Sequence, residues 1–313
     1  MEKDKLIFIA GKDGVAGSAI VRCLKEMGYQ HLLLPSHKEL DYSNQNDVNR
    51  YFKEKKPAYV FYAAAKMGSI VYRNEHPADI MYENMIMQMN VLRAAHENGV
   101  KKLLFMGSDF IYPRMSCNVL HEEDFLTAGL DEKDLPYTLA KIAGVKLCDY
   151  YHQQFGDEFF SVIPCAFFGI NSSFDVERAN VVASLIKRLH TAKVREEKEF
   201  VLWGSGKPVK EFLFSDDVAN ACIFLMQQDQ YFPMINIGSG DGGTSIWELA
   251  QIIRRIVGFS GEIVCDRTKP DGIMYRVMDS TKLHDCGWRA RYPLEEAIEL
   301  TYRHFLEMYG YKL

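Results

Sequence analysis

Three glycines that directly follow a short apolar segment constrain this chain more than any other feature. Residues 6–10 are uniformly apolar, as in a buried β-strand, and Gly11, Gly14 and Gly17 come next, before a helical pattern over residues 18–27. Glycines at a turn from strand to helix let the backbone approach a pyrophosphate, and the first turn of the helix offers free N–H groups. The sequence therefore predicts a dinucleotide site with these contacts: Gly11, Gly14, Val15 and Gly17.

Apolar segments and helical patterns continue to alternate through the first half of the chain. Strands are predicted at residues 6–10, 32–34, 59–65, 103–107 and 160–164, and helices at residues 15–27, 47–55, 80–98 and 139–155. This order is typical of an α/β protein with a doubly wound parallel (Rossmann) sheet.

The alternation weakens beyond Gly169, where short apolar segments mix with charged stretches. We interpret residues 1–169 as a dinucleotide-binding domain to which residues 211–227 return. Residues 170–210 and 228–313 are predicted to form a smaller C-terminal lobe that binds the substrate.

Composition limits the classes of partner. The 313 residues are 48% hydrophobic, which suffices for a large core, and the net charge is −5 without a long basic segment, which argues against nucleic acid or an anionic membrane. No apolar stretch approaches the roughly 20 residues that a spanning helix needs, and the start does not resemble a signal peptide. Seven cysteines without a Cys-x-x-Cys pair suit free thiols in the cytoplasm and no structural metal.

Ser108, Tyr137 and Lys141 predict the chemistry. Ser108 follows a predicted strand, where open α/β sheets place their ligands, and Tyr137 and Lys141 are one helical turn apart. A phenol titrates near 10, so a neighbouring ammonium that lowers its pKa would make it a better acid-base catalyst at neutral pH. A serine hydroxyl can hold a carbonyl oxygen while the tyrosine protonates it and a nicotinamide cofactor supplies hydride. The sequence therefore predicts a ketone reductase with Ser108, Tyr137 and Lys141 as catalytic residues.

Several segments carry a wider resemblance, at residues 63–68, 77–79, 137–148, 201–206, 211–213 and 269–272. From residue 9 to its end, the chain resembles the extended short-chain dehydrogenase/reductases, in particular the GDP-L-fucose synthases. The resemblance implies that Ser108, Tyr137 and Lys141 carry the reduction of a GDP-linked 4-keto sugar, in nucleotide-sugar biosynthesis for surface glycans. It also implies a homodimer in which helices 80–98 and 139–155 meet.

Two positions depart from this family. Its epimerisation of the sugar uses a Cys and a His, and the corresponding residues here are Phe110 and Asn180. A phenyl ring cannot transfer a proton, and an amide is a poor acid and base near neutral pH. We therefore expect a C4-keto reductase without C3/C5 epimerase activity. The alternatives are a bifunctional GDP-L-fucose synthase that uses His121, Cys117 or Asp175, and a non-catalytic nucleotide-sensing protein.

A dehydratase is disfavoured on similar grounds. The 4,6-dehydratases of this superfamily have Thr-Asp-Glu at the segment that reads Ser108-Asp109-Phe110 here, so the Asp is present and the Glu is missing.

The resemblance also implies the substrate contacts, with a 6-deoxy-hexose or a heptose as the sugar. Four residues are expected near the nucleotide and its pyrophosphate: Arg188, Trp203, Lys210 and Arg276. Three are expected near the sugar: Asp109, Phe110 and Asn180.

The cofactor is expected to be NADPH, with NADH as the weaker alternative. The second predicted strand is followed by Ser36, His37 and Lys38 instead of the acidic residue that NAD enzymes usually have there. Asp13 and His37 stand where the family has phosphate-binding arginines, which weakens this expectation. The resemblance adds further cofactor contacts: Ala63, Ala64, Ala65, Tyr137, Lys141 and Pro164.

Overall fold

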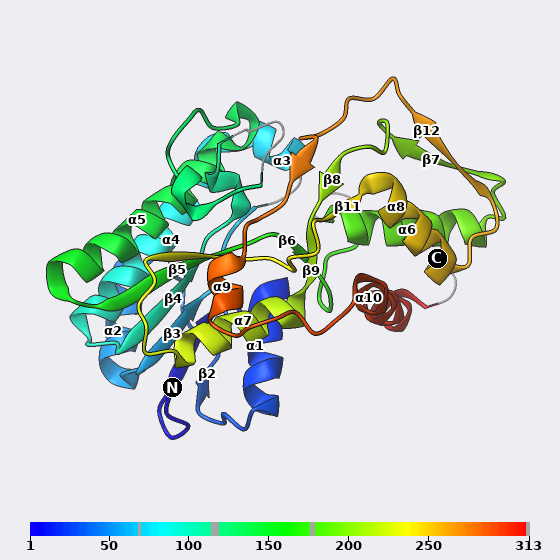
Figure 1. Cartoon of the computed structure of the whole chain (residues 1–313). Helices are drawn as coiled ribbons and strands as arrows, with labels where there is room; N and C mark the ends of the chain where they lie inside the picture. The colour runs from blue at the N-terminus through cyan, green and yellow to red at the C-terminus, as the bar shows by residue number, and fades with distance from the viewer. Residues whose placement is uncertain (68–69, 114–118, 176–178, 311–313) are drawn as a thin grey trace.

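A six-stranded parallel sheet forms the centre of the molecule, in a computed structural model that describes residues 1–67, 70–113, 119–175 and 179–310 (Figure 1). The strand order is β10-β5-β4-β3-β1-β2, and all five neighbouring pairs are parallel. The strands are β1 (Ile7–Ala10), β2 (Leu32–Leu33), β3 (Tyr59–Tyr62), β4 (Lys102–Met106), β5 (Glu158–Pro164) and β10 (Met234–Ile237). The predicted doubly wound α/β fold is confirmed.

Two groups of helices cover the sheet (Figure 1). Helices α1 (Val15–Glu26) and α7 (Ser215–Gln227) pack together, while α4 (Pro77–Glu97) packs against both α2 (Gln45–Lys55) and α5 (Leu135–Phe155). Both long helices begin earlier than predicted, because each has a proline in its first turn, where the missing N–H has no cost.

Strand β3 ends three residues before the predicted end. Its apolar continuation, Ala63 to Ala65, leaves the sheet and passes close to the glycine turn. A Cβ atom on Gly11 would lie only 2.8 Å from the Ala64 backbone, so the two segments are in direct contact. Ala64 is buried against this turn while Ala65 is exposed, so an apolar sequence continues here without a strand.

A second, separate core lies in the C-terminal half. It is built by α6 (Val181–Val194), α8 (Ile246–Val257) and α10 (Leu294–Tyr309), with the parallel pair β7 (Glu199–Trp203) and β12 (Glu262–Asp266). Short strands connect it to the large sheet: β6 (Ala166–Phe168), β8 (Val209–Lys210), β9 (Phe212–Phe214), β11 (Thr244–Ser245) and β13 (Tyr275–Arg276). Two further short helices are α3 (Ile70–Glu75) and α9 (Thr281–Asp285).

Within segment 228–313, which is predicted to belong to the smaller lobe, strand β10 and helix α9 lie at the large sheet instead. Strand β10 pairs with β5 at the edge of the large sheet, and α9 packs on β10. Ile235, Asn236 and Ile237 are fully buried. A strand of four residues with an asparagine in it has too little apolar pattern to be recognised in the sequence. The other domain boundaries stay a prediction.

Within the described residues, no helix is both long and apolar enough to span a membrane. Six cysteines of this part of the chain are free thiols, four of them buried.

Candidate active site

The glycine turn after β1 has no room for side chains. Gly11 has a φ of +84°, and a Cβ atom on Gly17 would lie 2.0 Å from the carbonyl oxygen of Gly11. Helix α1 begins after Gly14, which provides no side-chain cap. The N–H groups of its first turn are therefore available to an anion, as the pyrophosphate of a dinucleotide requires.

A cavity of about 630 Å³ opens beside this turn, where the segments after β1, β2 and β3 meet. Its volume is in the range typical of cofactor pockets. Six of the predicted cofactor residues line it: Gly11, Gly14, His37, Ala63, Ala64 and Ala65. The turn and the cavity together fit a dinucleotide.

Sequence reasoning missed several residues of this cavity, among them Lys12, Asp41, Tyr42 and Lys66. Lys12 and Lys66 directly follow the predicted residues Gly11 and Ala65. This position in the sequence was the only indication that they belong to the cavity. Asn84 fixes the second of them, because its side chain accepts from the Lys66 N–H at 2.9 Å and donates to the Lys66 carbonyl at 2.7 Å. Lys66 also forms a 2.7 Å ion pair with Glu83 on α4.

Ser36 and Lys38, which are also predicted to contact the cofactor, are not among the residues that line the cavity. Both the N–H and the hydroxyl of Ser36 donate to one carboxylate oxygen of Glu39, each at 2.8 Å. Lys38 is exposed.

Ser108, Tyr137 and Lys141 lie near the C-terminal end of β4. Ser108 is the second residue after the end of this strand. Tyr137 and Lys141 are both buried on α5. The Ser108 hydroxyl is near enough to the Tyr137 phenol to lower its pKa, an effect that burial outweighs. The Lys141 ammonium donates to the Met106 carbonyl at 2.7 Å and lies 5.9 Å from the centre of the Tyr137 ring.

Burial dominates the pKa of Tyr137 in this structure, and the predicted lowering of that pKa by Lys141 stays a prediction. Burial raises the pKa of Tyr137 well above its usual value, and the nearby Asp109 carboxylate raises it further. Burial also lowers the pKa of Lys141 to about 7. The Lys141 ammonium donates to a neutral backbone carbonyl and not to an anion. Desolvation is therefore the largest effect on the pKa of Lys141, as it is on the pKa of Tyr137. Tyr137 is therefore held as a neutral phenol, which is the form that can protonate a ketone oxygen.

Asp109 and Arg276 form an ion pair next to this tyrosine, with 2.5 Å between Nε and Oδ2. The side chains are only 9% and 18% exposed for Arg276 and Asp109, so the pair is largely shielded from water. Arg276 also donates to the Asp109 carbonyl. The arginine expected near the substrate pyrophosphate thus neutralises the aspartate that follows Ser108.

Phe110 lies between charged and aromatic groups. Its ring meets the Tyr137 ring edge to face, with 6.1 Å between the centroids. The guanidinium groups of Arg73 and Arg276 are 6.0 Å and 5.8 Å from its centroid. Arg73 itself is ion-paired with Asp134 at 2.7 Å. Position 110 therefore offers an apolar surface and no transferable proton.

Asn180 caps helix α6. Its side chain accepts from the Ala183 N–H at 2.9 Å and donates to the Phe167 carbonyl at 3.3 Å. Asn is common as the cap of a helix N-terminus. Its amide side chain is neither an acid nor a base near neutral pH.

The residues expected near the nucleotide fall into two groups. Lys210 of β8 lies opposite Arg276 of β13 in the parallel pairing of these two strands. Burial lowers the pKa of Lys210. Arg188 and Trp203 lie together in the smaller lobe, with 5.4 Å between the guanidinium and the indole ring, and Trp203 is 64% exposed. An exposed indole beside an arginine is a flat surface on which a base can stack.

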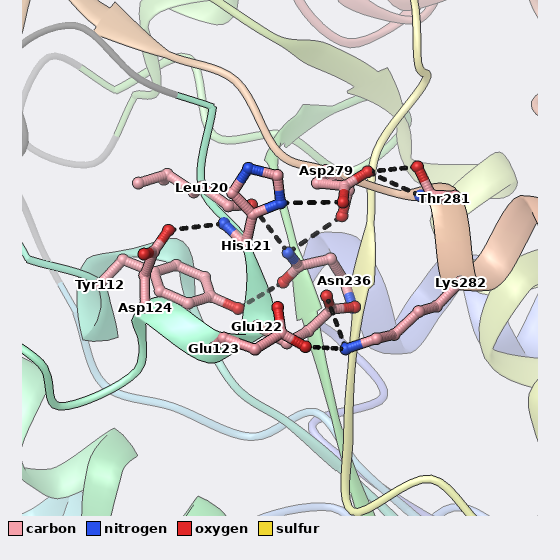
Figure 2. Close-up of polar contacts among 10 residues, drawn as sticks. All are labelled: Tyr112, Leu120, His121, Glu122, Glu123, Asp124, Asn236, Asp279, Thr281 and Lys282. Carbon is pink, nitrogen blue, oxygen red and sulfur yellow. Dashed lines mark hydrogen bonds and ion pairs between the residues drawn. The ribbon is translucent and has the colours of Figure 1, made fainter.

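Of the three alternative proton-transfer groups, His121 belongs to a polar network that Figure 2 shows in detail. Its Nδ1 lies 2.9 Å from the Asp279 carboxylate. The buried Asn236 of β10 donates to the carbonyls of Leu120 and Asp279, both at 3.1 Å, and accepts from the Tyr112 hydroxyl at 2.6 Å. This network joins Tyr112 and residues 120–124 to the segment that follows β13. Asp175 precedes α6, and Cys117 lies outside the described residues.

The comparisons with known proteins agree with this geometry. Residues 7–238 match the model of the "NAD dependent epimerase/dehydratase family". A curated relative, "Putative GDP-L-fucose synthase 2" of Arabidopsis thaliana, is 44% identical over 307 residues, covering 98% of this chain and 93% of the relative.

Two solved structures from Campylobacter jejuni are similar over nearly the whole chain. A GDP-6-OMe-4-keto-L-xylo-heptose reductase is 33% identical with a TM-score of 0.91, covering 98% of this chain and 99% of its own. A GDP-mannoheptose C4 reductase with NADP bound is 35% identical with a TM-score of 0.89, covering 97% and 99%.

Proposed function

This chain belongs to the NAD dependent epimerase/dehydratase family, and from that premise we propose that it is an NADPH-dependent reductase of the C4 ketone of a GDP-4-keto sugar, without C3/C5 epimerase activity. The names of the similar proteins support a GDP-sugar as the substrate, and the NADP bound in one of them supports the cofactor.

In the proposed reaction, Ser108 holds the C4 carbonyl oxygen and Tyr137 protonates it. A reduced nicotinamide supplies a hydride to C4 when it is bound, so the products are an alcohol and the oxidised dinucleotide. The high pKa of Tyr137 supports its role as the acid, because the phenol keeps its proton at neutral pH. Lys141, buried beneath Tyr137, supplies positive charge when protonated.

One observation carries the absence of epimerase activity. The Phe110 ring packs against Tyr137, and the resemblance to the fucose synthases implies that this position holds their acid-base Cys. Asn180, at the other position, is used as the cap of α6. Loss of one acid-base group typically costs about 10² to 10⁴ in rate, so the loss of both leaves reduction as the remaining reaction.

We further propose that Lys210 and Arg276 bind the pyrophosphate and that Arg188 and Trp203 bind the guanosine. Asp109, Phe110 and Asn180 would then lie on the sugar side. The sugar is a 6-deoxy-hexose or a heptose, and the reductases of heptose substrates among the similar structures favour the heptose.

A homodimer is part of the proposal. Helices α4 and α5 pack side by side, and their described residues include three large exposed aromatic side chains, Tyr82, Tyr150 and Phe155, which are 68%, 52% and 51% exposed. Exposed aromatic residues on paired helices suit a contact with the same helices of a second copy.

The alternative is a bifunctional GDP-L-fucose synthase, favoured by the 44% identity to a relative of that name. Its missing proton transfers would need another group, such as His121, whose ring nitrogen is tied to Asp279. A third possibility, a nucleotide-sensing protein without turnover, has no need of Ser108, Tyr137 and Lys141 together.

A single experiment separates the two enzymes. The protein is incubated in D₂O with NADPH and GDP-4-keto-6-deoxy-mannose or a GDP-4-keto-heptose, and deuterium in the reduced sugar is located by NMR. A reduced product without deuterium at C3 and C5 supports the proposal. Deuterium at either carbon contradicts the loss of epimerase activity, and no reduced product with either sugar contradicts the reductase.

A further inference from the structure

The strongest unexplained feature is a carboxylate that occupies hydrogen-bond donors in the segment after β2, part of which lines the cofactor cavity. We propose that Glu39, assisted by Asp13, competes with the 2′-phosphate of NADPH, so that this protein distinguishes only weakly between NADPH and NADH. The inference rests on the proposed function in one respect: a nicotinamide dinucleotide must bind in the cavity beside the glycine turn.

The location follows from the fold. In doubly wound sheets the adenosine ribose lies at the end of the second strand. Here the segment after β2 borders the cavity through Pro35 and His37, and the chain returns to it at Asp41, Tyr42 and Ser43. Ser36 and Glu39 lie between these lining residues in the sequence.

Glu39 already occupies the donors that a phosphate would use. Its Oε2 accepts from both the N–H and the hydroxyl of Ser36, at 2.8 Å each. These two hydrogen bonds, with a smaller contribution from the charge of Lys12, lower the pKa of Glu39 below its usual value. Glu39 is therefore a carboxylate at neutral pH, bound as an external anion would be.

The lysine of the glycine turn is compensated as well. Lys12 follows the first glycine of the turn, and its ammonium lies 2.9 Å and 3.1 Å from the two carboxylate oxygens of Asp13. Because Lys12 also acts on Glu39, one ammonium lies close to two carboxylates. Asp41, which accepts from the Ser43 N–H and hydroxyl, adds a third negative charge to the rim, and Lys38 on the same loop is exposed.

This arrangement acts oppositely on the two cofactors. A 2′-phosphate carries a charge of about −1.5 to −2, so it must displace Glu39 from Ser36 and Asp13 from Lys12 against like-charge repulsion. The 2′-hydroxyl of NADH carries no charge and can donate to the Glu39 carboxylate. A serine and a lysine near the 2′-phosphate usually favour the binding of NADPH over NADH. Here Ser36 and Lys12 already interact with carboxylates, so that preference is reduced.

The test measures binding without turnover. The affinities of the wild type for NADPH and NADH are determined by fluorescence titration, and those for adenosine 2′,5′-bisphosphate and adenosine 5′-monophosphate by calorimetry. The variants are Glu39→Gln and Asp13→Asn, and Glu54→Gln, an exposed residue of α2, is the matched control. The two mononucleotides differ only in the 2′-phosphate, so they isolate its contribution.

We expect wild-type Kd values for NADPH and NADH within about fivefold of each other, which is about 1 kcal/mol. Glu39→Gln should improve the binding of NADPH and of the bisphosphate by about tenfold and leave the monophosphate unchanged. Asp13→Asn should act in the same direction and Glu54→Gln should have no effect. The gain should shrink at high salt, because charge repulsion at an exposed rim is screened.

Two results would overturn the inference: a wild-type preference for NADPH above about 100-fold, or a preference that Glu39→Gln changes by less than about twofold. These differ from a failure of the proposed function, in which neither dinucleotide binds at all. A strong preference for NADPH together with normal binding would thus leave the reductase proposal in place.

Discussion

Arg276 and Asp109 lie 167 positions apart in the sequence and meet beside Tyr137, where Nε of the arginine is 2.5 Å from Oδ2 of the aspartate. Asp109 begins the short 3-10 helix Asp109–Ile111 that follows β4, and Arg276 belongs to β13 in the other half of the chain. The pair therefore connects the proposed acid catalyst to the segment that is expected to bind the substrate.

Removal of one partner of this pair should destabilise the protein. Arg276→Met leaves the Asp109 carboxylate without its counter-ion in a largely buried place, and we expect a loss of roughly 2 to 4 kcal/mol in the free energy of unfolding. The double variant Asp109→Asn with Arg276→Met should recover much of it, because no unpaired charge remains. Urea unfolding of the wild type, Arg276→Met, Asp109→Asn and the double variant measures this cycle. Equal losses for the single and double variants would show that the pair contributes through packing alone.

Tyr137→Phe tests the proposed acid. The substitution removes the phenolic proton and keeps the ring that packs against Phe110, so we expect the reduction rate to fall by about 10² to 10⁴. Kd for the dinucleotide should stay within about twofold, since the hydroxyl is not its main anchor. Single-turnover oxidation of NADPH gives the rate, and fluorescence titration gives the affinity. Unchanged turnover would remove Tyr137 from the mechanism.

Lys141 should make stability depend on pH. In the unfolded chain the lysine has its ordinary high pKa, while burial lowers the folded value to about 7. Between these values the unfolded state binds more protons, so the free energy of unfolding should rise with pH above about 7. Lys141→Met should lack this rise, and the difference between the two proteins across pH 6 to 9 isolates it. Parallel curves for wild type and variant would mean that the lysine stays protonated when folded.

Gly17 tests the tightness of the glycine turn. An alanine there would bring its Cβ to 2.0 Å from the Gly11 carbonyl oxygen, so the turn must shift. We expect Gly17→Ala to weaken dinucleotide binding by about tenfold or more. Gly129→Ala is the matched control, since nothing lies within 4 Å of a Cβ at that position. If both variants bind the dinucleotide like the wild type, the turn does not carry the pyrophosphate.

Local patterns in the sequence predicted the elements that short-range chemistry determines. The glycine spacing identified the turn and two of the residues that line the cavity beside it, Gly11 and Gly14, because a strand, a turn and a helix are adjacent in the chain. The same reasoning missed β10, a buried strand of four residues, whose place depends on pairing with β5 more than 70 residues earlier. It also missed the partners of Ser36 and Arg276, because hydrogen bonds between side chains leave no periodic pattern.

Phe110→Cys combined with Asn180→His tests whether two substitutions separate this chain from an epimerase. Loss of the Asn180 cap should cost about 1 kcal/mol of stability, and loss of the Phe110 ring removes its contact with Tyr137. Because neither residue donates to the ketone oxygen, we expect reduction to continue within about tenfold of the wild-type rate. Deuterium should appear at C3 or C5 of the product in D₂O only in the double variant. A wild type that already exchanges these protons, or a double variant that loses reduction while it remains folded, would show that positions 110 and 180 have another role.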